Sequence, residues 1–195
     1  MFNKRKQQSD ESASQGSNPP SSPTDKIAAI LDNWIEMNES KKKNEPNIFE
    51  CKTATSVTVK DYLLRMTKYA RIYSVSHDDL LIAVLMYVDR FVVKQSYRVN
   101  KYNIHRLLLS AFICATKFYC DDSNSNSYMA KVGGVTNLEL NELEAEFLFF
   151  IEFDLMITDR EFREAKKIIN NYISPQPVIV MEVEAIEAKP TRSPM

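Results

Sequence analysis

The stretch KYNIHRLLLSAFICATKFYC, residues 101–120, reads as a helix that is apolar over most of its surface. Its apolar side chains surround the helix axis instead of forming one stripe; they are Ile104, Leu107, Leu108, Ala111, Phe112, Cys114 and Ala115. Such a helix has neighbours on several sides, and small residues such as Ser110 let those neighbours approach closely. With Asn100 as its start, the stretch predicts a central helix at 100–120 in a compact all-α bundle.

Four other helix starts share a pattern, in which a Ser or Thr is followed three residues later by an acid and then by a periodic apolar run. The pairs are Thr58 and Asp61, Ser76 and Asp79, Thr136 and Glu139, and Thr158 and Glu161. The hydroxyl can accept a hydrogen bond from an unpaired backbone N–H, and the acid can reach back to the capping residue. We therefore expect a helix to begin at each pair.

The periodic runs behind these caps set the expected helix lengths. Including an amphipathic run near the N-terminus, the predicted helices are 25–40, 58–73, 77–93, 137–153 and 158–172. A short helical turn is expected near 127–132, closed by Gly133 and Gly134, because glycine accepts the left-handed backbone that ends a helix.

The composition argues against several classes of protein. The 195 residues carry 25 basic and 26 acidic side chains, so the chain lacks the excess of basic residues that is typical of nucleic-acid-binding proteins. No apolar run is long enough to span a bilayer, and no secretory signal is visible. The three cysteines show no pairing pattern and fit a reducing compartment, so a cytoplasmic or nuclear protein is expected. Residues 1–24, rich in serine and proline, are expected to be disordered.

Motifs for catalysis or metal binding are not found in the sequence. Its two histidines, His77 and His105, fit surface or structural positions, and its three glycines form no phosphate-binding loop. The run DDSNSN, 121–126, resembles the start of a calcium loop but lacks the turn glycine and the final glutamate. We therefore expect neither an enzyme nor a bound cofactor, metal or small-molecule substrate.

Charged residues inside apolar runs say more about function than the search for catalytic motifs does. Arg65 and Asp89 each lie among apolar neighbours, and a buried charge usually needs a partner. An Arg65–Asp89 ion pair between adjacent helices would satisfy both, although both side chains could instead reach solvent. Lys117 and Glu144 lie beside more aromatic residues than one helix face can bury. That surplus suggests a protein-binding patch, and the alternative is that both charges are ordinary exposed residues.

Four segments carry a family resemblance. They are MYVDRF (86–91), SAFICATKFYCDD (110–122), NSYMAKVGGV (126–135) and LNELEAEFLFFIEFDL (140–155). Together they resemble a cyclin box, more narrowly that of the P-type or U-type cyclins related to the yeast phosphate-pathway cyclin. The resemblance covers about 45–155 and implies one five-helix box. It is flanked by an N-terminal helix and loop at 25–44, a C-terminal helix at 156–173 and a flexible tail at 174–195. About 40 residues follow position 155, too few for a second box.

The resemblance implies a regulatory subunit that binds a cyclin-dependent kinase and orients its regulatory helix. Its kinase-binding residues would be Lys117, Phe118, Glu144, Leu148, Phe153 and Leu155. Arg65 with Asp89 would be the family's buried pair. From their position beside the contact patch we expect Asp121 or Asp122 to face basic residues of the kinase activation segment, and the alternative is a solvated acidic loop. Phosphate response, glycogen metabolism and cell-cycle control are all compatible with the subgroup. The alternative function is a cyclin-fold adaptor for a non-kinase protein or a transcription component.

Overall fold

The computed structural model describes residues 22–41 and 44–172, and its regular secondary structure over these residues is entirely helical. Seven helices follow one another in this part of the chain: α1 Pro23–Asn38, α2 Val59–Tyr69, α3 His77–Gln95, α4 Ile104–Tyr119, α5 Asn126–Gly133, α6 Asn137–Phe150 and α7 Asp159–Asn171. The all-α prediction is confirmed. The tails predicted at 1–24 and 174–195 fall almost entirely outside the described residues.

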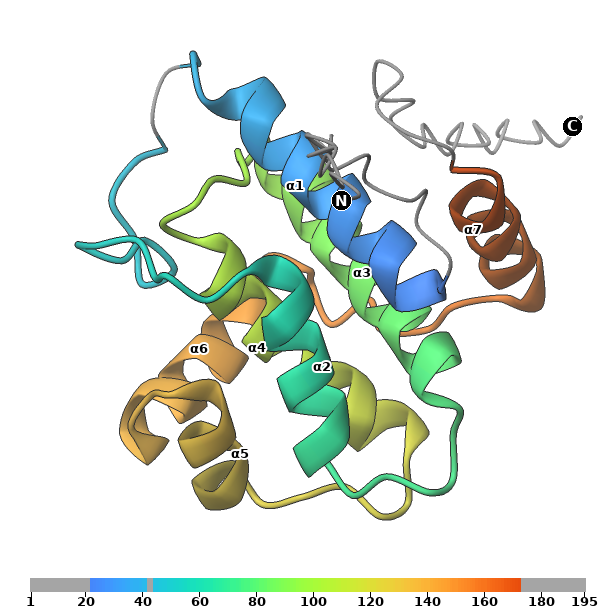
Figure 1. Cartoon of the computed structure of the whole chain (residues 1–195). Coiled ribbons are helices and arrows are strands. Elements are labelled where there is room, and N and C mark those ends of the chain that lie inside the picture. The colour runs from blue at the N-terminus through green and yellow to red at the C-terminus, as the bar shows by residue number, and fades with distance from the viewer. Residues whose placement is uncertain (1–21, 42–43, 173–195) are drawn as a thin grey trace, which may run out of the picture.

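Helix α4 is the centre of the bundle, as its apolar sequence predicts. It packs against α2, α3, α5 and α6, while α1 and α7 pack on α3 from the outside (Figure 1). Eleven residues of α4 are buried, including Ser110 and Thr116, whose hydroxyls donate hydrogen bonds to the carbonyls of Arg106 and Ile113. Bonding to the helix's own carbonyls lets these polar side chains lie in the core without an unsatisfied donor.

The predicted caps form at three of the four positions. The hydroxyls of Thr58, Thr136 and Thr158 each accept a hydrogen bond from the backbone N–H three residues on. Ser76 makes no such bond. Its expected partner Asp79 instead accepts a hydrogen bond from Lys166 of α7, at 2.8 Å. The structure adds a capping box that sequence reasoning missed, between Ser22 and Asp25, so α1 begins at Pro23.

Helix ends differ most from the predictions. The central helix starts at Ile104, not at Asn100, because residues 101–103 form turns. The Asn100 side chain accepts a hydrogen bond from the N–H of Tyr102, an interaction that competes with helix formation. Helix α2 ends at Tyr69, before the left-handed Arg71 (φ 51°), and α6 ends at Phe150, before the left-handed Glu152 (φ 58°) and Phe153 (φ 55°).

Gly133 and Gly134 fix the position of α5. A Cβ atom on Gly133 would lie 2.5 Å from Cδ2 of Leu109, so glycine lets α5 approach α4 closely. The Gly133 carbonyl accepts a hydrogen bond from the hydroxyl of Tyr62 on α2, at 3.1 Å. Gly134 has φ +77° and ends the helix in the left-handed conformation. The predicted stop is therefore confirmed, and the helix it ends is Asn126–Gly133.

Candidate partner-docking surface

Lys117 and Glu144 lie together on adjacent helices. Lys117 is in the last turn of α4, and its Nζ lies 2.6 Å and 2.8 Å from the two carboxylate oxygens of Glu144 on α6. The Lys117 side chain is 40% exposed and the Glu144 side chain 13% exposed. The structure thus joins two residues that lie 27 positions apart in the chain into one charged pair at the protein surface.

Asn126 completes this charged cluster from a third helix. Its Nδ2 donates to Oε2 of Glu144 at 2.6 Å and to Oδ1 of Asn141 at 2.8 Å. Sequence reasoning missed this role of Asn126. Its position as the first residue of NSYMAKVGGV, the segment that resembles the P-type subgroup, could have marked it as a candidate. Its contact with Glu144 could not be predicted, because it depends on how α5 packs against α6.

The apolar residues predicted for docking differ in exposure. Phe118 is 42% exposed and Phe153 is 66% exposed, whereas Leu148 and Leu155 are half-buried against the core. Two further apolar side chains are exposed nearby in the sequence, Phe149 on α6 and Met156 after it. We call the set of predicted residues the docking surface: Lys117, Phe118, Glu144, Leu148, Phe153 and Leu155. Of its two most exposed apolar members, Phe118 lies in the last turn of α4 and Phe153 lies three residues after the end of α6.

The segment after α6 is held in place by α3 and α4. Tyr87 on α3 and Tyr119 on α4 both donate hydrogen bonds from their hydroxyls to the carbonyl of Leu155, at 2.6 Å and 3.0 Å. The Tyr119 hydroxyl also accepts from the N–H of Ile157. These contacts connect Leu155 to the end of α4, next to Phe118, whose ring packs edge-on against that of Tyr119.

Arg90, the residue after Asp89, forms ion pairs that the sequence did not predict. Its guanidinium donates to the carbonyls of Asp154 and Met156, at 2.7 Å and 2.8 Å, and pairs with the carboxylates of Asp154 and Glu161, each at 3.3 Å. The fork of an arginine suits such a set of acceptors. Arg90 therefore ties α3 to the segment that carries Phe153 and to the start of α7.

The predicted Arg65–Asp89 ion pair is not formed. The Arg65 guanidinium lies 5.0 Å from the centre of the Tyr62 ring, and its buried Nε has no hydrogen-bond partner in the described part of the chain. Asp89 has no ion pair there either, and burial raises its carboxyl pKa to about 6. The bundle places Arg65 beside Gly134 of the α5 C-cap, because α2 packs against α5.

Asp121 and Asp122 lie in the loop after α4, and the structure treats them differently. Asp121 is exposed. Asp122 accepts hydrogen bonds from the N–H of Tyr73 and the hydroxyl of Ser74, both at 2.7 Å, which hold its pKa below the usual range. Asp122 thereby ties this loop to the one between α2 and α3, and of these two aspartates only Asp121 makes no hydrogen bond with the described residues.

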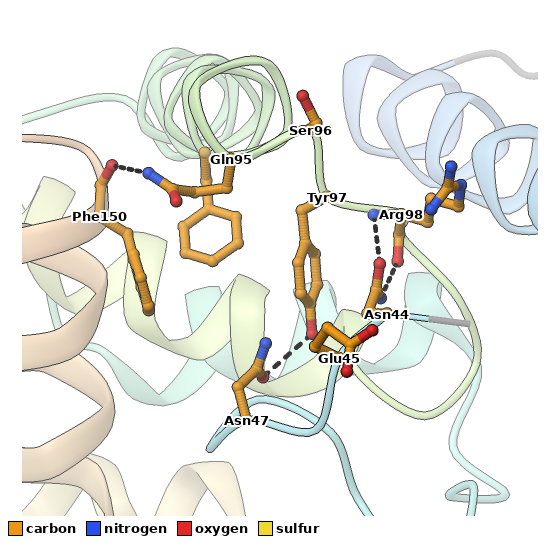
Figure 2. Close-up of a pocket in the computed structure, with 9 residues that line it drawn as sticks. Asn44, Glu45, Asn47, Gln95, Ser96, Tyr97, Arg98 and Phe150 are labelled. Carbon is orange, nitrogen blue, oxygen red and sulfur yellow. Dashed lines mark hydrogen bonds between the residues drawn. The ribbon is translucent and has the colours of Figure 1, made fainter. Parts of the chain in front are cut away.

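A cavity of about 300 Å³ opens beside the C-terminal end of α3. Figure 2 shows Phe150 and Tyr97 on opposite sides of it, with Asn47 below and Gln95 above. Its polar groups largely bond to one another: Gln95 donates to the Phe150 carbonyl, Tyr97 to Asn47, and Asn44 to the carbonyl of Arg98. The lining contains neither histidine nor cysteine, and the paired groups make it a structural junction of three segments.

Over residues 22–41 and 44–172, no three His, Cys, Asp or Glu side chains cluster as metal ligands would. In the same residues no helix combines the length and apolarity that a membrane span requires.

Comparison with known proteins gives one consistent family. Residues 1–155 match the family model described as Cyclin. Cyclin-U4-3 of Arabidopsis thaliana is 33% identical over 170 residues, which cover 85% of this chain and 73% of the relative. PHO85 cyclin-like protein psl1 of Schizosaccharomyces pombe is 37% identical over 135 residues, covering 68% and 54%. Cyclin-P4-1 of Oryza sativa subsp. japonica is 34% identical over 115 residues, covering 58% and 52%.

Proposed function

The chain belongs to the cyclin family, and from that premise we propose that it binds a cyclin-dependent kinase through the docking surface around Lys117 and Glu144. Members of the family are regulatory subunits without catalytic activity of their own. The U-type, P-type and PHO85-like names of its relatives support a kinase partner of the PHO85 type. Helices α2 to α6 correspond to the five helices of one box, over 45–155, with α1 and α7 flanking it.

The observation that carries the proposal is a surface ion pair whose lysine precedes the exposed Phe118 in the last turn of α4 and whose glutamate lies one helical turn before Leu148 on α6. Large apolar side chains such as Phe153, 66% exposed, are costly to leave in water and supply the desolvated centre of a protein interface. Lys117 and Glu144 offer a donor and an acceptor beside them. Such polar groups fix the orientation of a bound helix more than they add affinity.

The proposed mechanism is positional. A protein kinase is active only when a lysine on one of its strands pairs with a glutamate on its regulatory helix. Docked on Phe118 and Phe153, that helix would have its end fixed by hydrogen bonds from Lys117 and to Glu144. The cyclin would thereby raise the kinase's activity by stabilising one orientation, without contributing a catalytic group. Asp121 would lie beside the basic residues of the activation segment.

The proposed site of action is the cytoplasm or the nucleus. The three cysteines, Cys51, Cys114 and Cys120, are free thiols in the structure, which suits a reducing compartment.

The test uses the purified chain and a panel of purified cyclin-dependent kinases that includes a PHO85-type kinase. We expect at least one to bind and to gain activity towards a peptide substrate. Lys117→Ala and Glu144→Ala should each weaken that binding by about 10- to 30-fold, the effect of losing one hot-spot contact of about 1.4–2 kcal/mol. Lys131→Ala, an exposed lysine on α5, is the matched control and should bind as the wild type does.

Two results would contradict the proposal. If no kinase in the panel bound while proteins recovered from cells bound the wild type and the double Lys117→Ala/Glu144→Ala variant equally, an adaptor role would replace it. If a kinase bound but both single variants bound it normally, the docking surface would lie elsewhere on the bundle.

A further inference from the structure

In the free chain, Lys117 and Glu144 satisfy each other. Two of the three ammonium donors of Lys117 face the two Glu144 oxygens, at 2.6 Å and 2.8 Å. The lysine is the more exposed and more flexible of the two, at 40% against 13% for the glutamate side chain. A partner that takes hydrogen bonds from Lys117 will draw it away from Glu144. Something else must then keep the carboxylate in place, because a glutamate has three rotatable bonds.

Asn126 is placed to do so. Its Nδ2 lies 2.6 Å from Oε2 of Glu144, and its second donor is held by Oδ1 of Asn141, one helical turn before Glu144 on α6. The backbone of Asn126 is itself fixed, because it is the first residue of α5, directly after the capping residue Ser125. The other end of α5 is held by the contact of Gly133 with Leu109 and by the hydrogen bond from Tyr62.

The orientation of the amide has only one reasonable assignment. Both near neighbours of Nδ2 are acceptors, so turning the amide over would place its oxygen against a carboxylate at 2.6 Å. In the assigned orientation Oδ1 is buried and has no hydrogen-bond partner among the described residues. A buried acceptor without a donor is unfavourable for folding. What the asparagine contributes at this position is therefore its Nδ2, which holds the Glu144 carboxylate.

We propose that Asn126 is the positioning residue of the docking surface, which keeps the Glu144 carboxylate in its binding orientation when Lys117 turns to the partner. This inference rests on the proposed function, since it assigns Asn126 a role in the same kinase interaction. The inference also assigns a role to the segment NSYMAKVGGV, which is to position Asn126. The two glycines set the position of α5, and this helix delivers one amide donor to Glu144 while Lys117 reaches the same carboxylate from α4.

The experiment measures affinity for whichever kinase of the panel binds the wild-type chain. Asn126→Ala should weaken binding about tenfold, and Asn126→Asp, which keeps the shape but sets a carboxylate against Glu144, by at least as much. Asn124→Ala is the matched control, because Asn124 lies in the loop directly before α5 and its amide makes no hydrogen bond with the described residues. Unfolding midpoints are recorded for all variants, and Asn126→Ala should melt within about 3 °C of the wild type.

A double-mutant cycle separates positioning from a general effect on the fold. In a Glu144→Ala background, Asn126→Ala should change affinity by less than about twofold, because the carboxylate it holds is gone. An equal tenfold loss in both backgrounds would overturn the inference, and so would unchanged affinity of both Asn126 variants when Glu144→Ala binds weakly. If Glu144→Ala itself binds normally, the docking surface of the proposed function fails, and the inference fails with it.

Discussion

The neighbouring charged residues Asp89 and Arg90 on α3 differ in the contacts they make. Arg90 reaches four acceptors on the segment after α6 and on α7. Asp89 lies one residue earlier, half-buried, and makes neither a hydrogen bond nor an ion pair with the described residues. A step of one residue turns a side chain by about 100° around a helix, so the two point to different neighbours. Burial therefore penalises the Asp89 carboxylate, and the nearby charge of Arg90 offsets that penalty only in part.

Asp89 should make stability depend on pH in an unusual direction. Its folded-state pKa of about 6 is above the ordinary 3.8, so the folded state holds the proton more tightly than the unfolded state does. The resulting stabilisation is complete below about pH 4 and is lost as pH rises through about 6. Asp89→Asn should therefore raise the free energy of unfolding at pH 7.5 by about 1–2 kcal/mol, allowing for partial hydration of the side chain.

Urea titrations at pH 4.5 and 7.5 check this, with the difference between wild type and Asp89→Asn expected to shrink at the lower pH. Asp25 gives the opposite case for comparison. Its hydrogen bonds from Lys60 and Ser22 lower its pKa to about 2, so its contribution is lost on acidification. An Asp89→Asn variant no more stable than the wild type at pH 7.5 would show that Asp89 is well solvated.

Among the elements, α5 is the smallest helix of the described bundle and the one most dependent on two residues. Its N-terminus is capped by Ser125, whose hydroxyl accepts from the N–H of Tyr128, and its C-terminus ends at Gly134. The two glycines do different work. Gly133 allows contact with the side chain of Leu109, and Gly134 provides a backbone angle that most residues adopt only with strain.

Alanine at the two positions should therefore have different consequences. Gly133→Ala places a Cβ 2.5 Å from a fully buried leucine, which should cost about 1–3 kcal/mol by overpacking and displace α5. Gly134→Ala meets no close atom and should cost about 1 kcal/mol through strain alone. Gly134→Asn should be nearly neutral, since asparagine also ends helices in this conformation.

Thermal unfolding ranks the three variants, and kinase affinity provides the second readout. Gly133→Ala should weaken binding through the displaced Asn126, whereas Gly134→Asn should not. If Gly133→Ala and Gly134→Ala lost equal stability, the Leu109 side chain would be moving aside to make room for the methyl group at position 133.

As a whole, the described bundle keeps several large apolar side chains outside its core. Phe147 is fully buried and stacks on Phe91 with ring centres 5.3 Å apart, while Phe149 and Phe153, a few residues on, are 69% and 66% exposed. Exposure of Phe153 depends on the left-handed turn at Glu152 and Phe153, a strained arrangement for residues with side chains. Strain of this kind is common where a loop presents a binding residue.

Replacing the exposed rings of Phe118 and Phe153 should strongly weaken binding and leave the fold intact. The double variant Phe118→Ser/Phe153→Ser should reduce kinase affinity by about 100-fold or more, as expected for two central contacts, with an unchanged helical circular dichroism spectrum. Leu138→Ser, at the opposite end of α6 and 68% exposed, is the matched control and should bind normally. Should the double variant bind as tightly as the wild type, the partner would dock on another face.

Much of the helical framework could be predicted because it rests on interactions over three or four residues. The caps at Thr58, Thr136 and Thr158 formed as expected, and the apolar circumference of α4 correctly placed it in the centre. The helix ends after 69 and 150 could not be predicted, because the residues that end those helices are not glycine or proline. Left-handed Arg71 and Phe153 carry no signal in a single sequence.

Part of the candidate site could likewise be predicted from the sequence, and part could not. Lys117 and Glu144 were identified from the motif, and the structure joins them, but their roles in binding stay predictions. The third member, Asn126, emerged only when α5 was packed against α6. Periodicity and capping set the helices and their apolar faces, since each depends on residues close in the chain. Packing gave Arg90 its ion pairs, placed Arg65 over the Tyr62 ring and left Asp89 without an ion pair among the described residues. An ion pair between helices depends on angles and offsets that no local pattern encodes.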